Sequence, residues 1–435
     1  MGESILALLF LVVMLLLLAS GIWIGICLLG VGTFAMFFFT SRPVGDALAT
    51  TIWSQTSLWG LASLPLFIWM GEILFRTRLS ENLFNGLEPL ARRLPGGLLH
   101  VNLVGCSIFA AVTGSSFATI ATIGKMTIPE LKRRNYPDSM SLGTLAGAGT
   151  LGLLIPPSIT MIVYGVMVQE SIGRLFMAGF IPGFLLTIIF ACYVAGWGLF
   201  SREGQQLREK KSTFSQKIQG IKQLAPVVSL IVAVIGTLYS GIASPTEVAA
   251  VGVLGALILS VFQGSLTKKS FIESLLGATR TSSMILLLLA GSAALTLSLG
   301  FVGLPRSLAN WIGGMQLSSW MLIIALSVFY IILGCFMDGI SSIVLTMAVI
   351  EPLIRDAGFD MIWFGIFVVM LGEMALITPP VGFNLFLIQG MTGKDLSFIA
   401  RSALPMFIMM IIGLLLISAF PEIVLWLPKA MVAKP

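Results

Sequence analysis

The chain has 435 residues, of which 57% are hydrophobic and only 10% are charged, and its mean hydropathy is +1.02. Soluble domains carry about 25% charged residues, so this composition excludes an ordinary water-soluble fold. The formal charge of +6 comes from Lys and Arg residues that lie between apolar runs, which excludes a nucleic-acid-binding patch and is typical of membrane proteins.

The chain begins with two apolar segments. No charged residue occurs between Glu3 and Arg42, which leaves room for two helices with a short break at 19–21. Further uncharged runs lie at 47–71, 98–124, 139–169, 175–201, 223–246, 248–267, 281–305, 307–337, 374–393 and 402–421. Each run is predicted to be a helix, or a hairpin that dips into the membrane. The predicted fold class is therefore an all-α polytopic membrane protein.

One long polar connection interrupts this pattern at 201–222. Its basic residues are Arg202, Arg208, Lys210, Lys211, Lys217 and Lys222. This basic balance places the connection in the cytoplasm, and the N-terminus is then predicted to be periplasmic. The connection also divides the chain into two halves.

The two halves share landmarks at a constant spacing. Prolines recur 223 residues apart, and the pairs are Pro129 with Pro352, Pro156-Pro157 with Pro379-Pro380, and Pro182 with Pro405. Four proline positions at one offset indicate an internal repeat. With 201–222 inside, the basic residues near Pro129 fall in the cytoplasm and the charges near Pro352 fall outside. The repeat is therefore predicted to be inverted, as in secondary transporters.

Each half contains a predicted re-entrant hairpin. The first tip is Gly114-Ser115-Ser116, in the middle of an uncharged stretch, and the second is 338–342, with its own serine pair. Serine hydroxyls and freed backbone carbonyls form a hard-oxygen site suited to a small cation. A continuous helix whose serines bond to the preceding turn is the alternative.

Each half also contains a predicted broken helix at its Pro-Pro pair. Prolines remove backbone donors and free carbonyls one turn back, and such carbonyls can hold Na⁺. The N-terminus of the half-helix that follows attracts an anion. Asn384, after the second pair, can donate and accept near a bound anion. A simple proline kink is the alternative. No arginine within the predicted spans stands out as a clamp for a carboxylate.

Two acids lie within or beside the predicted spans. Asp338 is near the second hairpin tip, and Glu373 is inside the second broken helix. Intramembrane acids are functional candidates by default. Three roles stay open for each: binding Na⁺, carrying a proton, or bonding to neighbouring backbone.

These elements divide the chain into scaffold and transport segments. Scaffold helices are predicted at 1–57 and 223–280, scaffold or arm segments at 58–96 and 281–316, transport halves at 97–200 and 317–421, and a tail at 422–435. Amphipathic stretches at 80–95 and 304–313 are predicted to lie at the interface, as surface anchors or as arms that link moving and fixed parts.

Three stretches together resemble the large membrane subunit of tripartite ATP-independent periplasmic transporters. They are Thr113–Ile123, Tyr239–Gly252 with the run Ser-Pro-Thr-Glu-Val-Ala-Ala, and Glu373–Asn384 with the run Ile-Thr-Pro-Pro-Val-Gly. The resemblance covers nearly the whole chain. It implies a scaffold and a transport domain, built from two re-entrant hairpins and two broken helices, that moves as an elevator in the bacterial inner membrane.

The resemblance also implies an activity and partners. It implies import of an organic acid anion, such as sialic acid or a C4-dicarboxylate, coupled to Na⁺. A periplasmic binding protein would deliver the substrate, and a small four-helix membrane subunit on a separate chain would complete the scaffold. No cofactor and no metal other than Na⁺ are expected.

Residues carried over by the resemblance place two Na⁺ sites and one substrate site. The first ion site comprises Ser115, Ser116, Gly149, Thr150 and the carbonyls before Pro156, and the second comprises Gly339, Ser341, Ser342, Gly372 and Thr378. The substrate site between the tips comprises Ser116, Ser158, Ser342 and Asn384.

Three other functions are alternatives to this one. A stand-alone carboxylate symporter of the same fold, coupled to Na⁺ or H⁺, differs only in needing no binding protein. An intramembrane enzyme needs a catalytic dyad or metal, and the chain has a single histidine, so it is not expected to be an enzyme. A non-transporting assembly subunit leaves the paired breaks unexplained.

Overall fold

The computed structural model describes residues 3–77, 79–206, 212–303, 307 and 318–432, and every regular element among them is helical. In chain order the helices are α1 (Glu3–Ala19), α2 (Ile24–Phe39), α3 (Val44–Thr56), η1 (Trp59–Ala62), α4 (Ser63–Arg76), α5 (Leu79–Ala91), α6 (Leu99–Thr113), α7 (Ser116–Arg133), α8 (Asp138–Thr150), α9 (Ile159–Met167), α10 (Ile172–Phe200), α11 (Arg202–Gln206), α12 (Phe214–Tyr239), α13 (Pro245–Phe262), α14 (Lys268–Val302), α16 (Ser319–Gly334), α17 (Gly339–Asp356), α18 (Met361–Leu376), α19 (Phe383–Thr392), α20 (Leu396–Ala419) and α21 (Glu422–Val432).

Several of these helices can cross a membrane. Among the described residues, α10, α12, α13, α14 and α20 are long and apolar enough, and α3 with η1–α4 forms a further candidate span bent by 55°. By contrast α6, α16 and α18 have 15 or 16 residues. At 1.5 Å per residue they are too short for about 30 Å of hydrocarbon. These three short helices end at breaks in the chain that form the candidate site.

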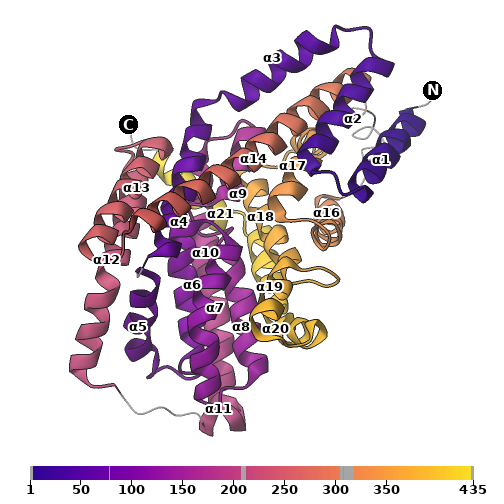
Figure 1. Cartoon of the computed structure of the whole chain (residues 1–435). Coiled ribbons are helices and arrows are strands. Elements are labelled where there is room, and N and C mark those ends of the chain that lie inside the picture. The colour runs from indigo at the N-terminus through magenta and orange to yellow at the C-terminus, as the bar shows by residue number, and fades with distance from the viewer. Residues whose placement is uncertain (1–2, 78, 207–211, 304–306, 308–317, 433–435) are drawn as a thin grey trace.

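The 35-residue helix α14 organises one side of the molecule. It packs along α2, α3 and α4, while α13 packs on α4 and α12 on α5. Figure 1 shows α14 running diagonally across the upper part, with α2 and α3 beside its C-terminal half. Helices α1–α4 and α12–α14 are termed the α14 group.

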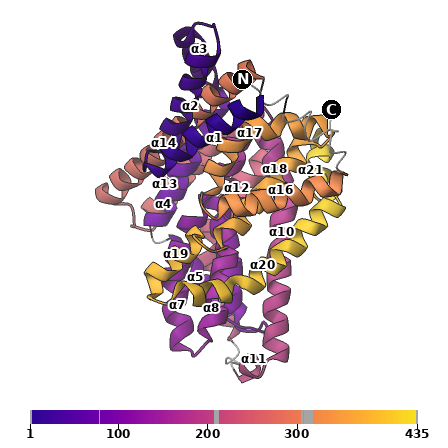
Figure 2. The same ribbon diagram turned by 90° about the vertical axis from the view of Figure 1, so that its right-hand side faces the viewer.

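The remaining long helices form a bundle. Within it α8 packs on α6, α7 and α20, and α18 packs on α16 and α17. Both views place α3 at one end of the molecule and α11 at the other, with α7 and α8 reaching toward α11 (Figures 1 and 2). Helices α6–α10 and α16–α21 are termed the bundle.

Small residues let α2 and α14 approach closely. A Cβ on Gly25 would lie 2.8 Å from the carbonyl oxygen of Leu287, and one on Gly32 would lie 2.8 Å from the carbonyl carbon of Ala294. Close backbone contact through small residues is how helices associate where lipid removes the hydrophobic driving force. The position of α14 beside α2 is therefore fixed by van der Waals contact along its length.

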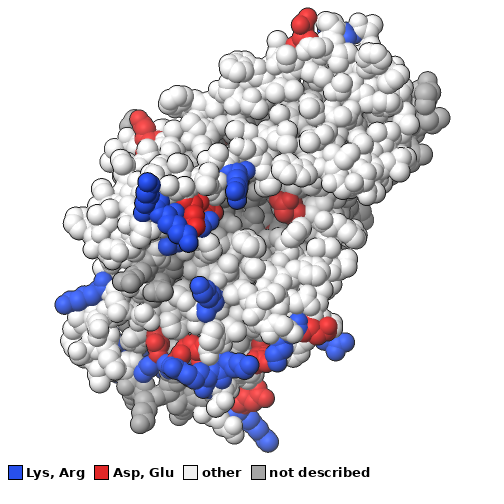
Figure 3. Space-filling view, in the orientation of Figure 1, with Lys and Arg blue, Asp and Glu red and all other residues white. Residues whose placement is uncertain are grey.

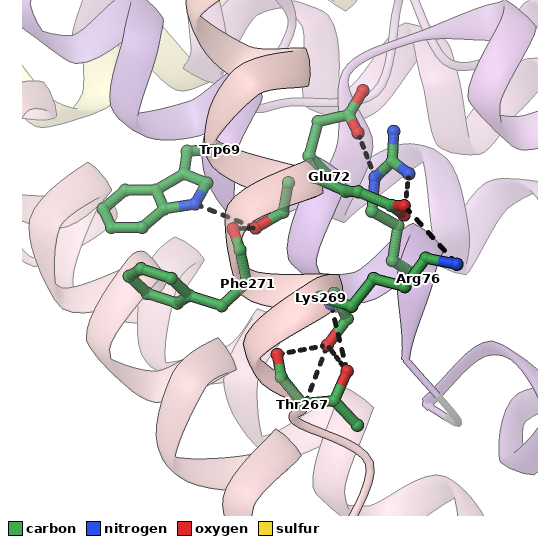
Figure 4. A network of polar contacts seen from close by, with 9 residues as sticks. Trp69, Glu72, Arg76, Thr267, Lys269 and Phe271 are labelled. Carbon is green, nitrogen blue, oxygen red and sulfur yellow. Dashed lines mark hydrogen bonds and ion pairs between the residues drawn. The ribbon is translucent and has the colours of Figure 1, made fainter.

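A polar network joins α4 to α14 (Figure 4). Arg76 bonds Glu72 at 2.9 Å and Glu273 at 3.1 Å, and Lys269 lies 4.0 Å from Glu273. Trp69 donates its indole N–H to Ser274 at 3.1 Å. Partly exposed pairs of this kind contribute at most about 1 kcal/mol each, so the network sets the register of the two helices more than it stabilises them.

The structure differs from the sequence prediction in two segments. The connection 201–222, predicted to be a loop, contains α11, and α12 begins at Phe214 behind a capping box of Thr213 and Gln216. The segment 422–435, predicted to be a tail, contains α21. The amphipathic stretch 80–95 lies largely in α5, whereas nearly all of 304–313 falls outside the described residues. Helix α14 is continuous across the predicted boundary at 280–281.

A cluster of charges ties α5 to the end of α7. Glu88 accepts from Arg92 at 2.6 Å and also pairs with Arg134. Burial acts to raise the pKa of Glu88, but the hydrogen bonds and charges of Arg92 and Arg134 prevail and hold that pKa below its ordinary value. A lowered pKa means that this stabilisation is present above about pH 4.3 and is lost as the pH falls through the folded-state value.

We expect Glu88→Gln to destabilise the protein by about 1 kcal/mol at neutral pH, because two arginines lose their charged partner. The melting temperature of purified protein at pH 7 and at pH 4 measures this. The difference from wild type is expected to shrink at pH 4. Glu422→Gln is the control, since its pair with Lys429 is solvent-exposed. Equal melting temperatures for both variants at pH 7 contradict the expectation.

Candidate functional site

The first predicted hairpin tip is a true interruption between two helices. Helix α6 ends at Thr113, and Gly114 follows in the left-handed region with φ of 59°. Ser115 is the N-cap of α7, and its hydroxyl accepts from the backbone N–H of Ala118 at 3.4 Å. The continuous-helix alternative is therefore wrong for this segment, and α6 and α7 pack against each other.

This tip contacts the break between α8 and α9. A Cβ on Gly114 would lie 2.6 Å from the carbonyl oxygen of Pro157. A Cβ on Gly152 would lie 2.7 Å from the carbonyl carbon of Ser115. Backbone of the tip and backbone of the break thus touch directly, at two glycines. The Pro156-Pro157 peptide bond in this break is cis, as is Pro379-Pro380 in the second.

The second tip is capped by an acid. Helix α16 ends at Gly334, and Asp338 is the N-cap of α17. Its carboxylate accepts from the backbone N–H groups of Ile340 at 3.1 Å and Ser341 at 3.2 Å, and from the Ser341 hydroxyl. Of the three roles left open for Asp338, bonding to neighbouring backbone is the one that this conformation displays.

The second tip reaches both broken helices. A Cβ on Gly372, in α18, would lie 3.5 Å from the Cα of Gly339. A Cβ on Gly339 would lie 3.8 Å from the side chain of Leu153, which belongs to the break between α8 and α9. Segments from both halves of the chain therefore meet at this tip.

The hydroxyl groups at the tips and breaks share one arrangement. Three of them donate a hydrogen bond to a backbone carbonyl nearby: Ser342 to that of Asp338 at 2.9 Å, Thr150 to that of Gly147 at 2.8 Å, and Thr378 to that of Met374 at 2.7 Å. A hydroxyl that donates in this way keeps its oxygen lone pairs for another partner. Such oxygens are suited to a hard cation.

Ser116 and Asn384 join the two halves. The Ser116 hydroxyl donates to the Asn384 side-chain oxygen at 2.9 Å, although the residues are 268 positions apart. Both side chains are buried, and the Asn384 amide nitrogen has no hydrogen-bond partner among the described residues. A buried donor without a partner is costly, so this nitrogen is a candidate for contact with a bound anion.

Ser158 and Glu373 take no part in the contact between Ser116 and Asn384. Ser158 is fully buried, accepts from the Met161 backbone N–H at 3.3 Å and donates to the Leu153 carbonyl, so it caps α9 and has no surface for a substrate in this conformation. Glu373, next to Gly372 on α18, is fully buried beside the backbone of Leu154, which belongs to the first break. All three roles of Glu373 remain open.

Two threonines that were not among the predicted site residues belong to the first tip. Thr119 donates to the Ser115 carbonyl at 2.7 Å, and its hydroxyl lies 3.3 Å from that of Thr113. The bond from Thr119 to the Ser115 carbonyl could have been predicted from the spacing of four residues, since a threonine hydroxyl in a helix often bonds to the carbonyl four residues before it. Gly149 packs against the Ile120 side chain of α7, which places the end of α8 along the same hairpin.

Apolar helices, some of them interrupted at buried tips and breaks, define a multi-pass membrane protein with a transporter fold. The solved structure of the Alcanivorax borkumensis YdaH transporter is similar, with a TM-score of 0.62 over 97% of this chain and 98% of that chain. At 14% identity this likeness concerns the fold alone.

The family follows from the sequence comparison. Residues 11–423 match the family described as "Tripartite ATP-independent periplasmic transporter, DctM component". The chain belongs to this family, as the large membrane subunit. It is 32% identical to the C4-dicarboxylate TRAP transporter large permease protein DctM of Rhodobacter capsulatus, over 95% of this chain and 96% of that one. It is 28% identical to the sialic acid TRAP transporter large permease protein SiaM of Vibrio cholerae, over 95% and 96%.

Proposed function

We propose that this subunit imports an organic acid anion together with Na⁺, and that the bundle moves as an elevator against the α14 group. The observation that carries the proposal is the convergence of both tips on the helix breaks. Hydroxyls there donate hydrogen bonds to neighbouring carbonyl oxygens, and tip backbone touches break backbone. Oxygen-lined breaks at membrane depth are where secondary transporters hold ions.

The order of elements supports an inverted repeat. A hairpin, a broken helix and a long helix follow each other as α6–α7, α8–α9 and α10, and again as α16–α17, α18–α19 and α20. Figure 3 shows basic side chains gathered at the lower end of the molecule near α5, α7 and α11 and in a second group half-way up on the left, whereas the upper right is almost uncharged. That end is then cytoplasmic, with the N-terminus in the periplasm of a bacterial inner membrane.

The nature of the substrate is inferred from chemistry that the two relatives share. A C4-dicarboxylate and sialic acid are both carboxylic acids, and both are ionised at neutral pH. The unpartnered amide nitrogen of Asn384, next to Ser116 and the N-terminus of α19, suits a carboxylate oxygen. A periplasmic binding protein would deliver the acid, and a separate small membrane subunit would complete the scaffold.

Uptake by proteoliposomes tests this function. The chain is reconstituted with its small subunit and a loaded binding protein, with and without an inward Na⁺ gradient. We expect uptake to need both Na⁺ and the binding protein, and to fall about tenfold or more in Ser116→Ala and in Ser342→Ala, because each loses a proposed ligand oxygen. Ser229→Ala is the matched control, since its hydroxyl bonds within exposed α12.

Each other outcome has a definite meaning. Uptake without the binding protein favours a stand-alone symporter. Uptake driven by a proton gradient and indifferent to Na⁺ overturns the sodium assignment and directs attention to Glu373. Wild-type rates in both serine variants remove the tips from the ion sites.

A further inference from the structure

A large cleft separates the α14 group from the second tip. Its volume is about 960 Å³, within the range of ligand pockets. One wall is formed by Trp23 and the first turn of α2, and another by the middle of α14. Asp338 and Ser341 of the second tip also line it. The cleft therefore lies between the part proposed to stay fixed and the part proposed to move.

One face of α14 forms the long wall of this cleft. Leu276, Arg280, Met284 and Leu287 all line it, at spacings of four, four and three residues, which places them in one stripe along the helix. The opposite face carries Ala278, Ser282 and Ile285, which are buried. Arg280 is thus an exposed cation in an otherwise apolar stripe, well inside the helix rather than at its end.

Arg280 makes no hydrogen bond or ion pair with the described part of the chain, and it therefore has no counter-ion there. Basic residues nearby differ in this respect: Arg76 pairs with Glu72 and Glu273, and Lys269 lies beside Glu273 (Figure 4). The Glu72 carboxylate lies against Gly277, one turn before Arg280, but it is bound to Arg76. Asp338 lines the same cleft, and its oxygens are directed to the first turn of α17.

An unpaired guanidinium in apolar surroundings is costly, and such residues in membrane proteins mark substrate pathways. A guanidinium binds a carboxylate through two parallel hydrogen bonds, which an amide cannot do. Apolar neighbours such as Met284 and Leu287 suit the carbon skeleton of the same molecule.

We propose that Arg280 binds the carboxylate of the transported acid in the cleft between α14 and the second tip. This inference rests on the proposed function, and it adds a substrate-binding residue on the α14 group. The acid would then exchange between a fixed arginine and the mobile tips. An anionic lipid headgroup offers similar chemistry, so the test separates the two sources.

The test compares Arg280→Gln with Arg280→Lys and with a matched control, Arg401→Gln, which alters an exposed arginine of α20 that does not line the cleft. Binding of succinate and of N-acetylneuraminate to the purified complex is measured by calorimetry, which needs no ion gradient. For the acid that binds wild type, we expect Arg280→Gln to weaken binding about tenfold, Arg280→Lys to weaken it less, and Arg401→Gln to leave it unchanged.

Two further measurements make the result decisive. The rise in melting temperature on adding Na⁺ is expected to be the same in Arg280→Gln as in wild type, which shows a folded protein with intact ion sites. Uptake is repeated in vesicles of phosphatidylcholine alone and of phosphatidylcholine with phosphatidylglycerol. A defect of Arg280→Gln in both kinds of vesicle supports binding of the acid.

Three outcomes overturn the inference: unchanged affinity in Arg280→Gln, a defect seen only with phosphatidylglycerol, or no binding of either acid to wild type. Failure of the proposed function gives a different result. Uptake by the wild-type protein is then independent of Na⁺, but it still depends on Arg280.

Discussion

Replacing Gly114 with alanine is expected to abolish most Na⁺-dependent uptake. Two costs combine at this position. An L-residue at a φ of 59° is strained by about 1 kcal/mol or more. Its Cβ would also lie 2.6 Å from the carbonyl oxygen of Pro157, a distance that forces the tip away from the break. Because tip and break together are proposed to hold the ion, a small displacement removes the site.

A matched glycine separates the two costs. Gly393 has a φ of 68°, and a Cβ placed on it meets nothing within 4 Å. Gly393→Ala therefore suffers the backbone strain alone and is expected to keep Na⁺-dependent uptake within about twofold of wild type. The apparent affinity for Na⁺ is measured for both variants in proteoliposomes, with the melting temperature as a check on folding. If both variants lose uptake equally, backbone strain explains the loss and the contact with Pro157 does not matter.

The breaks in the helices were predictable because their causes are local. A glycine followed by two serines, or a pair of prolines, favours a break in a helix through local backbone chemistry alone. The sequence therefore located both tips and both breaks, and the structure places helix ends at Thr113, Gly334, Thr150 and Leu376. The inverted orientation of the halves and the elevator movement stay predictions, because they depend on the membrane and on a second conformation.

The helices in the charged segments were not predicted, because they depend on contacts with other parts of the chain. The region 201–222 was assigned from its charge alone, but Gly220 packs on Gly86 of α5, and Ser212 donates to the Pro89 carbonyl at 2.8 Å. Tertiary contact thus supports a helix that charge counting cannot find. Thr213 and Gln216, three residues apart, are the local signal that was available.

Arg280 could not be identified as a binding residue from the sequence. It lies immediately before the uncharged run 281–305, so the sequence placed it at the edge of a span and no clamp was identified. Helix α14 begins at Lys268, which moves Arg280 into its interior. Whether that face of the helix lines a cleft depends on α2 and on the second tip, which are far away in sequence, and no local pattern reports it.

Asn384→Asp is expected to eliminate uptake of the acid while leaving Na⁺ binding in place. The side-chain oxygen that accepts from Ser116 is retained, so the contact between the halves at 2.9 Å survives. The buried amide nitrogen, which has no partner in the described structure, becomes a carboxylate oxygen. If that nitrogen faces the substrate, the variant replaces a donor with a like charge, and close like charges in a poorly solvated site repel strongly.

A pair of variants distinguishes charge from shape. Asn384→Ala removes both the acceptor and the donor without adding charge, and it is expected to weaken uptake by about tenfold to a hundredfold through the lost hydrogen bonds. Asn384→Asp is expected to be the more severe of the two, although it is closer in shape to asparagine. Uptake and the Na⁺-induced rise in melting temperature are measured for both. Near-normal uptake in Asn384→Asp would show that the amide nitrogen does not face the anion, and the substrate would then have to bind elsewhere between the tips.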